Sequence, residues 1–106
     1  MNYFDLSDAE LMSRLKQDDR IAFETIYRRH ASDLFKYLSG KVDAKDDCEE
    51  ILIDVFTTLW LDRYSVDGEL IDYLSPSVNN RLVLYARDNP QSQLFTHFKQ
   101  SFYETL

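Results

Sequence analysis

Apolar residues between positions 48 and 60 recur at steps of three and four, and this spacing constrains the fold more than any other feature of the chain. Such a period places the residues on one face of an α-helix. We expect this helix to follow an N-cap at Asp43, to end at about Arg63 and to be acidic on its opposite face. The apolar face comprises Cys48, Ile51, Leu52, Val55, Phe56, Leu59 and Trp60.

Two further helices are predicted before this one. Ser7 and Glu10 have the spacing of a capping box, in which each residue bonds the amide of the other, and a short helix to about residue 17 should follow. Asp18-Asp19 then interrupts the pattern and provides a new N-cap for a helix of about 18 residues, which should stop at Gly40. The apolar positions of that helix are Ile21, Ala22, Ile26, Ala31, Leu34, Phe35 and Leu38.

A fourth helix is predicted after a polar loop over residues 64–68. Ser75-Pro76 has the pattern of an N-cap followed by proline at the first helical position, where a missing amide hydrogen is harmless. This helix should run to about Arg87, because Asp88-Asn89-Pro90 disfavours helical backbone. Beyond it, Leu94, Phe95, Phe98 and Phe102 again have helical spacing and leave room for a fifth helix.

The composition supports a helical fold. Among 106 residues there are only two Gly and two Pro, too few for the many tight turns of a β-sandwich or barrel. We therefore predict an all-α fold, a small bundle of four to five helices. Residues 1–90 should form one helical domain, and residues 91–106 a helical tail or the start of a linker.

Charge is distributed unevenly along the chain. The net charge of -7 argues against a protein that binds duplex DNA by itself. Residues 21–41 contain four basic and two acidic residues. Residues 42–54 contain six acidic residues and only one basic residue, Lys45. This local acidity indicates a surface for a basic partner, although an ordinary solvated helix face would show the same pattern.

The sequence offers little for side-chain catalysis. His30 and His97 lie far apart without flanking metal ligands, Cys48 has no second cysteine, and two glycines cannot form a phosphate-binding loop. We expect no enzymatic activity, no catalytic residue, no metal and no cofactor. The single cysteine and the lack of a long apolar run or apolar leader favour a cytoplasmic protein without a membrane span.

Three segments resemble region 2 of the extracytoplasmic-function sigma factors, the bacterial proteins that direct RNA polymerase to promoters. Residues 19–38, 47–60 and 73–87 match that family's patterns in order and spacing. The matching positions are Asp19, Ala22, Phe23, Tyr27, Arg29, Leu34 and Tyr37 in the first segment, Asp47, Glu49, Val55, Phe56, Leu59 and Trp60 in the second, and Tyr73, Leu74, Asn80 and Arg87 in the third.

The resemblance implies two surfaces. The helix of residues 46–63 would dock on the arginine-rich clamp helices of the largest subunit of core RNA polymerase, and the fourth helix would follow the non-template strand of promoter DNA at the minus-ten element. A loop over residues 64–70 would hold a flipped base. The implied polymerase-binding residues are Asp47, Glu50, Ile53, Asp54 and Thr57, and the implied DNA-binding residues are Tyr73, Asn79, Asn80, Arg81, Leu84 and Arg87.

Three departures from the family pattern qualify this expectation. Ile53 replaces the usual glutamine of the docking helix, and Pro76 lies where the DNA-facing helix is normally continuous, which predicts a shorter helix. The family's second, promoter-binding domain (region 4) is not expected in the residues after Arg87.

A different class of function fits the same residues. The chain could be a helical interaction module that binds polymerase or an anti-sigma protein without opening DNA, as a monomer or a dimer. Its apolar tail would then offer a partner face formed by Leu94, Phe95, Phe98, Phe102 and Tyr103.

Overall fold

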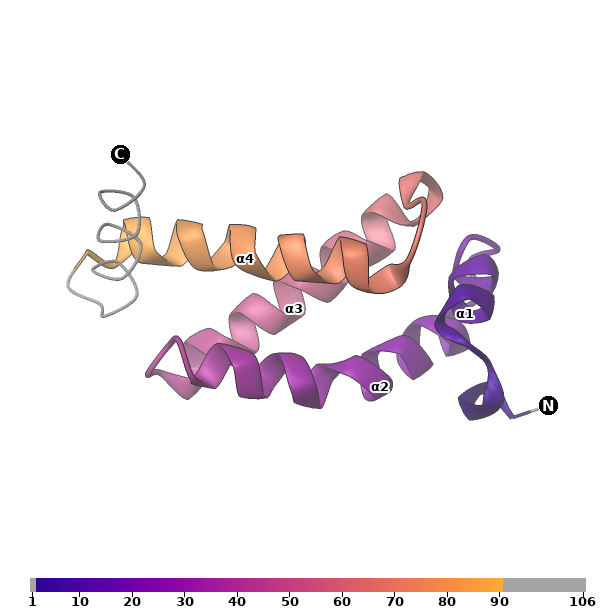
Figure 1. The fold of residues 1–106 in the computed structure, drawn as a ribbon, viewed down its shortest axis with the longest axis horizontal. Coiled ribbons are helices and arrows are strands. Elements are labelled where there is room, and N and C mark those ends of the chain that lie inside the picture. Colours follow the sequence, from indigo (N-terminus) through magenta and orange to yellow (C-terminus); the bar gives the residue numbers. More distant parts are fainter. Residues whose placement is uncertain (1, 91–106) are drawn as a thin grey trace.

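A computed structural model describes residues 2–90, and the chain is all-α over that range (Figure 1). Its four α-helices are α1 (Asp8–Leu15), α2 (Arg20–Ser39), α3 (Lys45–Asp62) and α4 (Leu70–Asp88), with short 3₁₀ helices η1 (Tyr3–Asp5) and η2 (Arg63–Ser65). The predicted fold class is confirmed. The predicted fifth helix lies outside the described residues.

The first two helices start as the sequence predicts. The Ser7 hydroxyl accepts from the Glu10 amide at 3.1 Å, as predicted, whereas the Glu10 carboxylate accepts from the Ser7 hydroxyl at 3.2 Å in place of the predicted bond to the Ser7 amide. Asp18 reverses the chain with a φ of 62°, and the Asp19 carboxylate then accepts from the amides of Ile21 and Ala22. These caps satisfy amides that have no partner within their helix.

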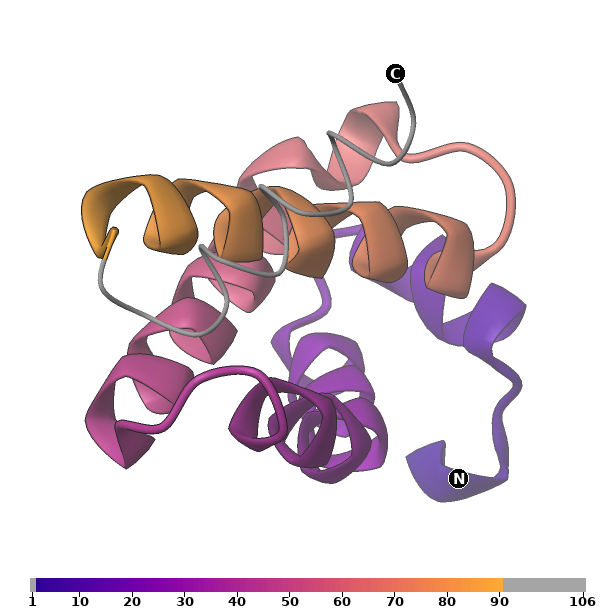
Figure 2. The ribbon, with the colours of Figure 1, turned by 60° about the vertical axis from the view of Figure 1, so that its left-hand side comes forward.

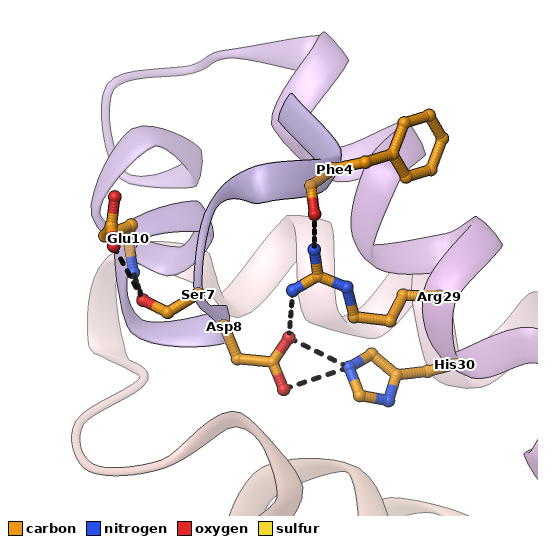
Figure 3. Close-up of polar contacts among 6 residues, drawn as sticks. All are labelled: Phe4, Ser7, Asp8, Glu10, Arg29 and His30. Atoms are coloured by element: carbon orange, nitrogen blue, oxygen red, sulfur yellow. Dashed lines mark hydrogen bonds and ion pairs between the residues drawn. The ribbon is translucent and has the colours of Figure 1, made fainter. Parts of the chain in front are cut away.

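One carboxylate ties α1 to α2. Asp8 accepts from Arg29 Nη1 at 3.0 Å, and both of its oxygens lie 3.1 Å from His30 Nε2 (Figure 3). The same guanidinium donates through Nη2 to the carbonyl oxygen of Phe4 at 3.1 Å. The N-terminal segment is therefore fixed to the middle of α2 by hydrogen bonds as well as by packing.

The start of α3 differs from the prediction. Its N-cap is Ala44, which makes no capping hydrogen bond, whereas Asp43 is exposed one residue earlier. The preceding loop buries Val42, whose carbonyl oxygen accepts from the Cys48 thiol, and the backbone is still extended at Ala44. Because Val42 is buried in the preceding loop, the helix starts only after Ala44. The prediction of Asp43 as the N-cap is therefore wrong.

The start of α4 also differs. The helix begins at Leu70, after an N-cap at Glu69, and passes through Pro76 without ending. Leu70 and Leu74 precede the proline and are almost completely buried. Burying two leucines contributes roughly 3–6 kcal/mol, which exceeds the cost of about 3 kcal/mol for a proline inside a helix. The prediction of Ser75 as N-cap and of a shortened helix is therefore wrong.

The core lies between α3 and its neighbours. Figure 1 and Figure 2 show α3 crossing between α2 and α4, while α1 packs on α2. Phe56 and Leu59 of α3 point inward, as predicted, and Trp60 packs edge-on against Phe23 with ring centroids 5.5 Å apart. No helix within residues 2–90 is long and apolar enough to cross a membrane.

Candidate functional site

The outer face of α3 is an acidic ridge, formed by Asp47, Glu50, Ile53, Asp54 and Thr57. All of them except Asp47 are exposed, and Ile53 is 58% exposed although it is apolar. Their spacing places them on the side of the helix away from Phe56 and Leu59. The five residues expected to bind polymerase therefore share one surface.

Within this ridge, Asp47 forms a hydrogen bond to a residue of α4. Its Oδ2 accepts from the hydroxyl of Tyr85 on α4 at 2.9 Å. Burial, the hydrogen bond to Asp47 and the nearby negative charge all raise the pKa of Tyr85, so that the phenol remains a donor at neutral pH. This contact fixes the N-terminal half of α3 against the C-terminal half of α4.

Beside the ridge, on its α4 side, lies an acidic groove of about 350 Å³. Four carboxylates and one guanidinium line it, so its local charge is negative. Its lining residues are Asp47, Glu50, Ile51, Asp54, Arg81, Leu84, Tyr85, Asp88 and Asn89.

On the opposite flank of the ridge, between α2 and α3, lies an apolar groove of about 510 Å³. Tyr27, Ala31 and Phe35 of α2 line one wall at intervals of four residues, and Leu52 and Ile53 of α3 line the other. The Tyr27 ring packs edge-on against Phe56 at 4.9 Å, which fixes this wall. Ser32, Lys36 and Glu49 complete the lining.

Four of the six expected DNA-binding residues lie together. Tyr73, Asn80, Arg81 and Leu84 line a groove of about 340 Å³ between α3 and α4, here called the α3–α4 groove. Arg81 Nη2 donates to the Thr58 hydroxyl at 2.9 Å, which turns the guanidinium toward α3. The remaining lining residues are Thr58, Asp62, Asp72, Pro76 and Ser77.

Tyr73 is fixed at one end of that groove. Its hydroxyl donates to Asp62 Oδ2 at 3.1 Å. Burial and the neighbouring carboxylate raise the pKa of Tyr73 to about 12, so the phenol stays neutral and keeps its proton for the hydrogen bond to Asp62.

The other two expected DNA-binding residues lie elsewhere on α4. Asn79 Oδ1 accepts from the hydroxyl of Tyr37 at 3.1 Å, which places this side chain toward α2. Arg87 is exposed in the last turn, three residues beyond Leu84. Tyr73, Asn80, Leu84 and Arg87 follow a helical spacing of seven, four and three, whereas Asn79 falls outside it.

The segment of residues 64–70 is fixed at both ends. The Arg63 guanidinium lies 3.9 Å from the ring centroid of Trp60 and 4.4 Å from that of Tyr64, and it donates to Asp18 at 2.8 Å. The Tyr64 hydroxyl also donates to Asp18. At the other end, Val66 and Leu70 are buried. The loop expected to hold a flipped base is thus attached to the turn that joins α1 and α2.

The described residues include no cluster of three or more His, Cys, Asp and Glu side chains that could hold a metal ion. Comparisons with protein-family models, with curated proteins and with solved structures found no match to this chain.

Proposed function

We propose that this chain is a sigma-region-2-like domain, which binds core RNA polymerase through α3 and recognises and opens the minus-ten promoter element through α4. The observation that carries the proposal is that the acidic ridge of α3 and the α3–α4 groove lie side by side on two helices that pack together. A protein that holds polymerase while it holds an unpaired strand needs two such adjacent surfaces.

The ridge suits an arginine-rich helical partner. Glu50 and Asp54 are exposed and lie one helical turn apart, so they can accept charge-assisted hydrogen bonds from guanidinium groups. Ile53 lies beside them, on the flank of α3 that faces α2, and supplies apolar surface that a partner would bury. Charge sets the orientation and the rate of association, while burial of Ile53 slows dissociation.

The α3–α4 groove suits a base that has left the duplex. The Tyr73 ring offers a stacking surface, Asn80 offers a donor and an acceptor, and Arg81 offers a cation for phosphate. Asp62 and Asp72 line the same groove, so free DNA should bind weakly. Opening should depend on the polymerase to supply most of the positive surface.

A second function remains a candidate because of those same carboxylates. They repel phosphate, and Arg81 already donates to Thr58. Both features favour a helical module that binds polymerase or an anti-sigma protein without touching DNA.

Promoter opening separates the two functions. We expect the double variant Asn80→Ala, Arg81→Ala to bind core polymerase like the wild type but to lose opening of a promoter with a fluorescent base at the minus-ten element. The matched control is Asn79→Ala, whose side chain faces α2 and whose loss should leave opening within about twofold, since separate sites act independently. Polymerase binding without opening by the wild type would favour the interaction module.

A further inference from the structure

The turn between α1 and α2 is joined by polar contacts to the segment that connects α3 to α4. In this turn, Asp18 Oδ1 accepts from Arg63 Nε at 3.0 Å, from Arg63 Nη2 at 2.8 Å and from the Tyr64 hydroxyl. Lys16 Nζ of the same turn lies 3.8 Å from Asp67 Oδ1 of the connecting segment. The position of that segment therefore depends on a turn that lies far from it in the sequence.

Asp18 has a backbone conformation that few side chains adopt. Its φ is 62°, and it is the only non-glycine residue with a positive φ among residues 2–90. Glycine adopts such a φ freely, whereas Asp and Asn tolerate it better than other residues that carry a side chain. The turn by itself would be satisfied by glycine, so the carboxylate serves a second purpose, which its contacts identify.

Arg63 transmits the position of Asp18 to two aromatic rings. Its guanidinium lies over the rings of Trp60 and Tyr64, and its Nη1 donates to the carbonyl oxygen of Trp60 at 2.6 Å. The Arg63 side chain is only 14% exposed. Asp18 thus fixes a guanidinium that would otherwise have several rotamers open to it.

Tyr64 is held in place and yet remains accessible. Asp18 fixes its hydroxyl and Arg63 lies over its ring, but the residue is 59% exposed. The hydrogen bonds from Tyr64 and Arg63 lower the pKa of Asp18, so the carboxylate is charged at neutral pH. A side chain that is already immobilised loses less conformational entropy when a ligand binds to it.

From these contacts we propose that Asp18 is a positioning residue, which acts through Arg63 to hold Tyr64 and the segment of residues 64–70 in the arrangement that receives an unpaired base. The positioning of Arg63 and Tyr64 rests on geometry alone. The use of that arrangement in promoter opening rests on the proposed function.

The fluorescence of Trp60 tests the positioning in the full chain. Trp60 is the single tryptophan, so its quenching by acrylamide reports whether Arg63 still covers the indole. We expect Asp18→Gly to increase this quenching, because glycine keeps the turn but releases the guanidinium. Asp18→Asn should lie close to the wild type, since it tolerates the same backbone and keeps an acceptor oxygen.

The matched control is Gln17→Gly. Gln17 is the exposed neighbour of Asp18 in the same turn, so this variant adds backbone freedom there but keeps the carboxylate. Its quenching should equal that of the wild type, and circular dichroism checks that every variant is folded. Unchanged quenching in Asp18→Gly would overturn the positioning. Equal increases in Asp18→Gly and Gln17→Gly would also overturn it, because flexibility of the turn would then be the cause.

Promoter opening tests the functional part separately. Asp18→Gly should bind core polymerase like the wild type but open a promoter with a fluorescent minus-ten base about tenfold less, if the released segment keeps the held arrangement about a tenth of the time. Asp18→Asn should restore most of the opening. Equal losses of polymerase binding and opening in Asp18→Gly would overturn a specific role in opening. If quenching changes as expected but the wild type opens no promoter, the positioning of Tyr64 stands and the proposed function fails.

Discussion

Asp8 joins α1 to α2 through its contacts with Arg29 and His30. Burial alone raises the pKa of its carboxyl, but the hydrogen bonds and positive charges of His30 and Arg29 outweigh burial and lower this pKa below its ordinary value of 3.8. The folded protein therefore binds a proton at Asp8 less readily than the unfolded chain does. The stabilisation is complete well above pH 3.8 and is lost as the pH falls through the folded-state pKa.

Replacing Asp8 should remove part of this acid sensitivity. We expect Asp8→Asn to be less stable than the wild type at about pH 7, but to lose less stability between about pH 7 and about pH 3. Urea unfolding at both values measures the difference. Asp5→Asn, which alters an exposed carboxylate in η1, is the control. An equal acid-induced loss in Asp8→Asn and the wild type would contradict this role for Asp8.

At the scale of single residues, the sequence predicts which residues approach one another only where spacing along one helix decides the outcome. Tyr73, Asn80 and Leu84 follow helical spacing and do lie in one groove. Asn79 directly precedes Asn80, yet its contact with Tyr37 turns it toward α2. A one-residue shift along a helix rotates a side chain by about 100°, so a shared segment is no guarantee of a shared surface.

At the scale of elements, α4 shows how packing overrides local signals. Ser75-Pro76 has the pattern of a helix start, but α4 already extends through two turns at that point. The apolar residues at every fourth position indicate the extent of α4 better than Ser75-Pro76 does. This pattern continues on both sides of the proline, and its residues are all buried. Those residues are Leu70, Leu74, Val78, Leu82 and Ala86.

Pro76 should consequently lower the stability of α4. It is exposed, and its lack of an amide hydrogen leaves the carbonyl of Asp72 without its helical donor. We expect Pro76→Ala to raise the free energy of unfolding by about 1–3 kcal/mol, measured by urea denaturation. Ser75→Ala, at the neighbouring exposed position, should change it by no more than about 0.5 kcal/mol. A less stable Pro76→Ala variant would show that the proline serves the helix in some other way.

At the scale of the whole molecule, α3 is the organising element. One side of it forms the core, its outer face forms the acidic ridge, and its two flanks border the acidic and the apolar groove. The ridge could be predicted because its residues belong to one helix with a clear period. The apolar groove could not, because Tyr27 and Ile53 meet only through the packing of α2 on α3, which no local pattern specifies.

Binding of the purified full chain to core RNA polymerase tests whether the acidic ridge of α3 is a polymerase-binding surface. We predict saturable binding by the wild type, a loss of roughly tenfold or more in Asp54→Arg, and little change in the control Asp5→Arg, which reverses another exposed charge, in η1 rather than α3. Failure of the wild type to bind, or equal weakening of binding by both charge reversals, would contradict this role of the ridge.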